Sequence, residues 1–132
     1  MRVVADSHVV VWYAQNSPRL SPTAGEALDA AEAEGGIVVS VATLVDLWYV
    51  TQTTEGVTKD QLDALQDDLL ASPAVELHPV TVEVTDAYTE IARTVLSDPW
   101  DRFIVATAKA LNLPLVTRDA AIRQAALVDT VW

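Results

Sequence analysis

The sequence of 132 residues contains no cysteine. This absence excludes disulfide bonds, thiol nucleophiles and zinc sites built on thiolates, and it fits a reducing cytoplasm. Long hydrophobic runs are also missing: the longest spans only residues 9–14, whereas a membrane helix needs about 20 apolar residues. Asp6 interrupts the only apolar segment near the N-terminus, which argues against a signal peptide. We therefore expect a cytoplasmic protein that makes no contact with a membrane.

Basic residues are scarce. The chain has 8 Lys and Arg residues against 19 Asp and Glu residues, for a net charge of −11. Taken alone, this balance argues against a broad nucleic-acid-binding surface. It does not exclude a nucleic-acid enzyme, because bound divalent cations would reverse the local field at an acidic site. Half of the basic residues lie beyond residue 100: Arg102, Lys109, Arg118 and Arg123.

Apolar segments alternate with amphipathic ones along the whole chain. Hydrophobic residues make up 51% of the sequence, which predicts one globular domain over residues 1–132. Short apolar runs predict strands at residues 2–5, 37–39, 115–117 and 127–131, with an extended segment at 75–79. Helical spacing and capping residues predict helices at residues 22–34, 41–53, 59–71, 80–95, 99–111 and 120–125. Residues 9–13 fit a short apolar helix or a turn, and residues 55–58 a turn. This alternation predicts an α/β fold of three layers (α/β/α) around a central, mainly parallel sheet of four or five short strands.

Acidic side chains follow the predicted strands. Asp6 closes the first strand and Asp119 comes just after the third. Because parallel strands end at the same sheet edge, where ligands bind in such folds, these two carboxylates should lie near one another. Asp6 also fits a plain helix cap. Asp46 lies in the second turn of the helix after the second strand, within reach of the edge, although its position alone slightly favours the solvent face.

The segment Asp98-Pro99-Trp100-Asp101-Arg102 predicts a helix start. Asp98 fits the N-cap and Pro99 the first helical position, where its missing N–H costs nothing. Asp101 falls on the first turn, where the positive end of the helix dipole tolerates an acid. The segment fits a simple cap and a functional site about equally well. We expect its helix to begin beside the same sheet edge if the preceding segments return there.

Four carboxylates at one edge would need a counter-charge. Mg²⁺ or Mn²⁺ would supply it, because both prefer carboxylate and water ligands. Zinc is disfavoured, since the chain offers neither a thiolate nor a convincing pair of histidines. Two such ions about 3.5–4 Å apart suit the hydrolysis of phosphodiester bonds without a side-chain nucleophile.

Four segments resemble the PIN-domain family, in particular the VapC-like ribonuclease toxins of bacterial toxin–antitoxin pairs. They are residues 4–12, 40–48, 98–106 and 115–119, in the family's order and at about its spacing. The resemblance implies a metal-dependent endoribonuclease that uses one or two Mg²⁺ or Mn²⁺ ions. It assigns the site to acids and hydroxyls at these positions: Asp6, Asp46, Asp101 and Asp119, with Asp98 as an accessory metal ligand and Ser7 and Thr117 as nearby hydroxyls. Many relatives carry Glu where this chain has Asp46. The Asp side chain is one methylene shorter, so activity would be weaker if its carboxylate did not reach the metal ion.

The resemblance also implies partners. It predicts an RNA substrate, a homodimer, and a cognate antitoxin protein whose C-terminal segment covers the active-site groove. Arg102, Arg118 and Arg123 are candidates for contacting RNA phosphates, and each fits an ordinary surface arginine at least as well. His8 could line the pocket, but we expect it to pack within the first helix.

Two other functions compete with this interpretation. The first is a catalytically weak or inactive PIN-like module that binds proteins, which the Asp46 departure keeps open. The second is a phospho-acceptor domain of the response-regulator type. That domain would have adjacent acids after the first strand and a lysine at a late strand end, whereas here Ser7 follows Asp6 and Lys109 lies in mid-helix.

Overall fold

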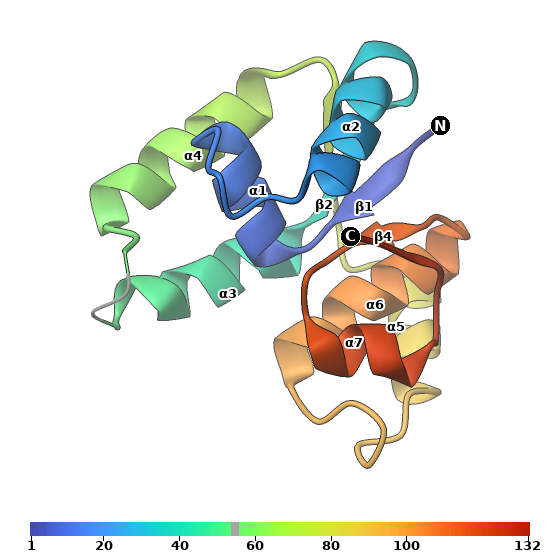
Figure 1. Cartoon of the computed structure of the whole chain (residues 1–132). Coiled ribbons are helices and arrows are strands. Elements are labelled where there is room, and N and C mark those ends of the chain that lie inside the picture. Colours follow the sequence, from blue (N-terminus) through green and yellow to red (C-terminus); the bar gives the residue numbers. More distant parts are fainter. Residues whose placement is uncertain (54–55) are drawn as a thin grey trace.

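The computed structural model describes residues 1–53 and 56–132 (Figure 1). Its described residues form one five-stranded sheet in the order β3-β2-β1-β4-β5, and every strand pair in it is parallel. The strands are short and largely apolar: β1 Val3–Ala5, β2 Ile37–Ser40, β3 Val75–His78, β4 Leu115–Val116 and β5 Thr130–Val131. The predicted α/β fold with a central parallel sheet is confirmed.

Helices cover both faces of the sheet, as predicted for a three-layer fold. They are α1 Ser7–Ala14, α2 Pro22–Ala30, the π-helical turn η1 Ala31–Gly35, α3 Val41–Thr51, α4 Lys59–Ala71, α5 Val82–Thr89, α6 Pro99–Leu111 and α7 Ala120–Ala125. One apolar core lies between the sheet and α1, α2 and α4, and a second lies between the sheet and α5, α6 and α7 (Figure 1). Helix α3 packs against α1 and α4 on one side and α6 on the other, so it joins the two halves at the carboxyl ends of the strands.

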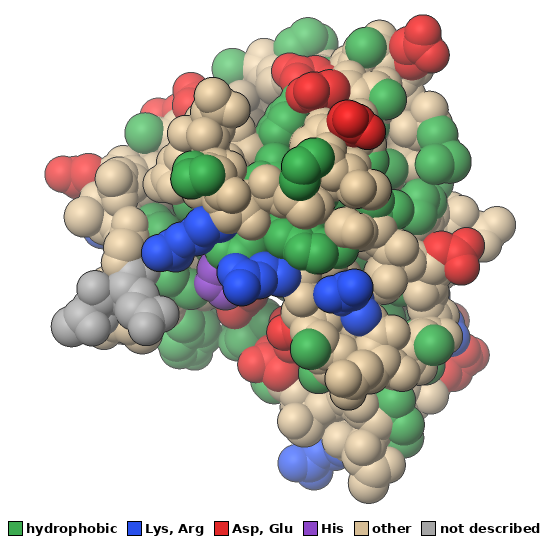
Figure 2. All heavy atoms as spheres, in the orientation of Figure 1, with side chains coloured by type: hydrophobic (Ala, Val, Ile, Leu, Met, Phe, Trp, Pro, Cys, Tyr) green, Lys and Arg blue, Asp and Glu red, His purple; other side chains and the backbone are tan. Residues whose placement is uncertain are grey.

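The boundary between the two halves is open to solvent on the face shown in Figure 2. There, Lys and Arg side chains gather along the border of a hollow, with Asp and Glu side chains beside them (Figure 2). Within the described residues, no helix combines the length and the apolar character that crossing a membrane requires.

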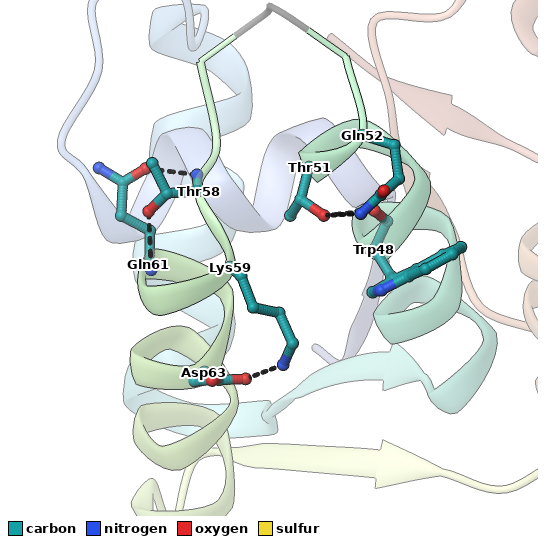
Figure 3. A network of polar contacts seen from close by, with 7 residues as sticks. All are labelled: Trp48, Thr51, Gln52, Thr58, Lys59, Gln61 and Asp63. Carbon is teal, nitrogen blue, oxygen red and sulfur yellow. Dashed lines mark hydrogen bonds and ion pairs between the residues drawn. The ribbon is translucent and has the colours of Figure 1, made fainter.

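Local capping explains where several helices begin. Ser21 caps α2 and Asp98 caps α6, each followed by Pro at the first position as predicted. Thr58 begins α4 through a capping box with Gln61, in which each side chain bonds the other residue's backbone N–H (Figure 3). Next to it, Lys59 pairs with Asp63 one turn along α4. The turn predicted at 55–58 includes Glu55, which lies outside the described residues.

Some predicted boundaries were wrong. The helix expected over residues 80–95 ends at Thr89 in the structure. Arg102, from α6, donates a hydrogen bond of 2.7 Å to the carbonyl oxygen of Ile91 and holds the chain in turns beyond that point. The helix expected over residues 22–34 changes to the π-helical turn η1 after Ala30. The last strand is confined to Thr130 and Val131, because only these residues pair with β4.

Candidate active site

A cleft of about 620 Å³ opens at the carboxyl ends of β1 and β4. Five carboxylates line it: Asp6, Asp46, Asp98, Asp101 and Asp119. We call this the acidic cleft. The structure thus brings together all the acids that the sequence and the family resemblance single out, from four separate regions of the chain.

Asp6 is the most buried of these acids, with 7% of its surface exposed. Its Oδ1 accepts a hydrogen bond of 2.8 Å from the backbone N–H of Ser7, and its Oδ2 accepts one of 2.7 Å from the hydroxyl of Thr117. The Thr117 hydroxyl also accepts the backbone N–H of Asp119 at 3.0 Å, so it ties the ends of β1 and β4 together. Burial raises the pKa of Asp6, and these hydrogen bonds oppose that rise only in part. Asp6 therefore caps α1 and lines the cleft at once.

Asp46 points into the acidic cleft, so the slight preference for its solvent face was wrong. The hydroxyl of Ser7 donates a hydrogen bond of 2.6 Å to its Oδ2. The reason is tertiary: α3 packs against α1, which brings the Asp46 face of α3 against the start of the first helix. Burial raises the pKa of Asp46, and the charge of Asp98 adds to that rise.

Asp98 and Asp101 enter the cleft from the start of α6. Oδ1 of Asp98 accepts the backbone N–H groups of Trp100 and Asp101, at 2.8 and 3.0 Å. The carboxylate of Asp101 accepts no hydrogen bond from the described part of the chain. Burial raises its pKa to about 8, with further contributions from the charges of Asp6, Asp98, Asp119 and Asp46. At neutral pH the metal-free protein therefore keeps Asp101 mostly protonated.

The donor set suits a hard divalent cation, since it consists of carboxylates and hydroxyls. Burial and the charges of the neighbouring carboxylates together raise the pKa of Asp101 to about 8, and such an ion would neutralise the negative charge that these groups concentrate in the cleft. In residues 1–53 and 56–132, however, no three acidic or histidine side chains are arranged around a common point as metal ligands. The chemistry of the cleft thus fits Mg²⁺ or Mn²⁺.

Two arginines line the acidic cleft, and only one of them was predicted. Arg118, which was predicted, lines the cleft, and its guanidinium lies 5.8 Å from the ring centre of Trp12. Arg19 also lines the cleft. No local sequence pattern marks Arg19, because it lies in the loop between α1 and α2, whose course depends on tertiary packing.

The two other predicted arginines lie elsewhere. The guanidinium of Arg102 lies 4.3 Å from the ring centre of Tyr88 and bonds the Ile91 carbonyl, so it fastens α6 to the end of α5. Arg123 is exposed on α7. Neither is among the residues that line the acidic cleft. His8 does line it, and its ring is exposed while its centre lies 5.6 Å from that of Trp12 in the same helix.

The bond from Thr117 to Asp6 yields a prediction about stability. Thr117 is fully buried, and Thr117→Val removes its hydroxyl at nearly constant volume. We expect the free energy of unfolding to fall by about 1–2 kcal/mol, because a buried carboxylate loses a partner. Thr107→Val is the matched control, since the equally buried Thr107 only bonds a carbonyl of its own helix. Urea unfolding at pH 7 measures both; equal losses would contradict the role assigned to Thr117.

Comparisons with known proteins agree with this fold and site. The family model for the PIN domain matches residues 3–127, so the chain belongs to the PIN-domain family. No match was found among curated proteins.

Solved structures show the same fold. VapBC2 from Rickettsia felis, bound to a promoter DNA fragment, gives a TM-score of 0.70 at 20% identity and covers 98% of this chain and 97% of its own. DNA-bound VapBC from Salmonella typhimurium gives a TM-score of 0.70 at 15% identity, and the match covers 98% of this chain and 96% of the VapBC chain. FitAcB from Neisseria gonorrhoeae gives 0.62 at 23% identity, with the same coverage of 98% and 96%.

Proposed function

We propose that this PIN-domain protein is a metal-dependent endoribonuclease and the toxin component of a toxin–antitoxin pair. The observation that carries the proposal is the convergence of five carboxylates on one cleft, where burial and their mutual repulsion raise the pKa of Asp101 to about 8. Such a cluster is costly without a cation, which makes it a functional rather than a structural feature. The likeness of the fold to VapBC structures supports the same assignment.

Asp6, Asp46, Asp101 and Asp119 would hold one or two Mg²⁺ or Mn²⁺ ions, with Asp98 at the helix start as an accessory ligand. When bound, such an ion lowers the pKa of water and stabilises charge on a phosphodiester group. The hydroxyls of Ser7 and Thr117 hold the carboxylates of Asp46 and Asp6 in place.

The RNA would approach the acidic cleft along its basic border. Arg19 and Arg118 would bind its phosphates and so position the scissile bond over the carboxylates. Arg102 and Arg123 have no part in this scheme, since neither lines the cleft.

The likeness to toxin–antitoxin structures also supports a proposal about the partners of this chain. VapBC-5 from Mycobacterium tuberculosis is described as a member of a family of toxin–antitoxin systems. For this chain we propose a cognate antitoxin that inserts a basic side chain among the carboxylates, a homodimeric assembly, and a cytoplasmic location. A basic side chain would offset the same repulsion that a metal ion offsets, so antitoxin and metal would compete for the cleft.

The proposal is tested with purified, antitoxin-free protein and a pool of structured RNAs. We expect cleavage with Mg²⁺ or Mn²⁺ and none after chelation. Cleavage that survives chelation would refute metal dependence. If the folded protein binds metal but leaves its cognate RNA intact, the second candidate function, a protein-binding module, replaces the nuclease. The bond from Ser7 to Asp46 favours the nuclease, because it directs the shorter acid into the cleft.

Ser7 offers a prediction within this scheme. Ser7→Ala removes the hydroxyl that holds Asp46 while keeping the backbone N–H that bonds Asp6. We expect the cleavage rate at saturating RNA to fall about tenfold, the usual loss for an outer-shell partner of a metal ligand. Ser21→Ala is the control, since that hydroxyl caps α2 away from the acidic cleft. An unchanged rate in Ser7→Ala would show that Asp46 needs no such support.

A further inference from the structure

A second cavity, of about 640 Å³, adjoins the acidic cleft. The two share three wall residues, His8, Trp12 and Arg19, so they form one continuous depression. We call the second part the side cavity. It lies beside α1 and the second half of α3, and none of the five acids lines it.

The walls of the side cavity combine apolar and polar groups, and they lack the carboxylates of the acidic cleft. Val11, Leu47 and Val50 give it apolar sides, while Gln15 adds a side-chain amide. No hydrogen bond from a described residue engages that amide. A cavity of about 300–1,000 Å³ that offers both apolar sides and hydrogen-bonding groups has the size and chemistry to hold a small organic group.

Two aromatic rings stand where the cavities meet. Trp12 is 9% exposed and fixed by packing, with its ring centre 6.0 Å from that of Trp132. The His8 ring centre lies 5.6 Å from that of Trp12 with the two planes tilted by 41°, and the exposed His8 lines both cavities. His8 therefore stands at the junction, where a planar group that enters from the acidic cleft can contact its exposed ring.

Charge limits how this protein can hold RNA. The chain carries a net charge of −11, and only Arg19 and Arg118 supply basic side chains to the acidic cleft. Few phosphate contacts mean little electrostatic affinity. Base stacking on aromatic rings is independent of net charge and adds affinity for unpaired nucleotides.

We infer that the side cavity is a nucleobase subsite: it takes one unpaired base of the RNA, next to the scissile phosphate, against His8, while the Gln15 amide bonds the edge of that base. This inference rests on the proposed function and gives it a source of sequence preference. Arg19 borders both cavities, so it binds the phosphate that links this nucleotide to the scissile one.

The experiment compares two variants with the wild type on an RNA library randomised around its cleavage site, read by sequencing the new ends. Gln15→Leu removes the amide at similar size, and Val50→Phe fills the cavity. Gln66→Leu, exposed on α4, is the control. We expect the wild type to prefer one base beside the cut by at least about fivefold, the lower end of stacking effects. Gln15→Leu should reduce that preference to about twofold or less, as the edge contact is lost.

Val50→Phe should behave differently. Its cleavage rate on the preferred RNA should fall about fivefold or more. On an RNA that lacks the base at that position, the variant should cleave as fast as the wild type, because neither protein then has a base to stack. Unchanged base preference in both variants would overturn the subsite while leaving the nuclease intact. So would weaker antitoxin binding without any change in base preference, which would make the side cavity a protein-binding surface.

Binding separates this inference from the proposed function. Fluorescence anisotropy of short labelled oligoribonucleotides, with the full chain and chelator present, reports base preference without cleavage. If no RNA is cleaved but the base-dependent affinity exists and both variants abolish it, the nuclease fails and the subsite stands. If affinity is the same for every base and for the abasic oligomer, the subsite is overturned.

Discussion

Replacing Asp101 with Asn is expected to lower metal-dependent RNA cleavage by at least about a hundredfold, since even outer-shell changes at metal sites cost about 10–100-fold. Asp101 is the one acid of the cleft whose carboxylate accepts no hydrogen bond from the described residues. Both of its oxygens are thus open to an ion. Asn keeps the size of the side chain but removes the charge, so the cause of the loss would be chemical rather than steric.

The fold of this variant should be intact. Asp101 lies on the first turn of α6, whose cap is Asp98, and its own backbone N–H still bonds that cap after the change. Circular dichroism and thermal unfolding check this point. Asp98→Asn is the matched comparison: Asn still caps a helix, so we expect a smaller loss of cleavage. Equal cleavage by the Asp101→Asn variant and the wild type would remove this residue from the site.

Stability of the metal-free protein should fall as pH rises from about 4 to about 8, the window set by the raised pKa of Asp101. The sign follows from proton binding. Within this window the folded state holds a proton on Asp101 that the unfolded chain has released, so raising the pH favours unfolding. Burial raises the pKa of Asp6 and of Asp46 too, and both act in the same direction.

Asp101→Asn isolates this contribution because Asn does not titrate. Four pKa units would correspond to more than 5 kcal/mol, but solvent screens this partly exposed group, so we expect about 2–3 kcal/mol. At pH 8 with chelator, the variant should therefore melt about 6–12 °C above the wild type, while at pH 4 the two should coincide. Scanning calorimetry in chelator measures both. Parallel pH profiles for the two proteins would show that burial and the neighbouring charges do not raise the pKa of Asp101 in the folded state.

Much of this architecture could be predicted from local sequence. Ser21-Pro22 and Asp98-Pro99 mark helix starts through contacts within one turn, and short apolar runs mark buried strands. The position of Asp6 at a strand end then follows from parallel topology alone. These features could be predicted because each depends on residues close together in the chain.

What the sequence could not predict depends on packing between distant segments. Asp46 turns into the cleft because α3 packs on α1 and meets Ser7, 39 residues earlier in the chain. The early end of α5 depends on Arg102, which belongs to the following helix. Arg19 reaches the cleft from a loop. No local pattern encodes these three placements.

If the five carboxylates form a site for a divalent cation, the purified protein should bind Mn²⁺. Isothermal titration of the metal-free protein at pH 7, in buffers of different ionisation enthalpy, gives both affinity and proton exchange. We predict saturable binding with release of close to one proton, because the pKa of Asp101 is about 8 before the ion binds. Asp101→Asn should bind more weakly and release almost no proton. Absence of saturable binding by the wild type would show that the five carboxylates do not form a metal site. Binding that Asp101→Asn leaves unchanged would show that Asp101 is not a ligand.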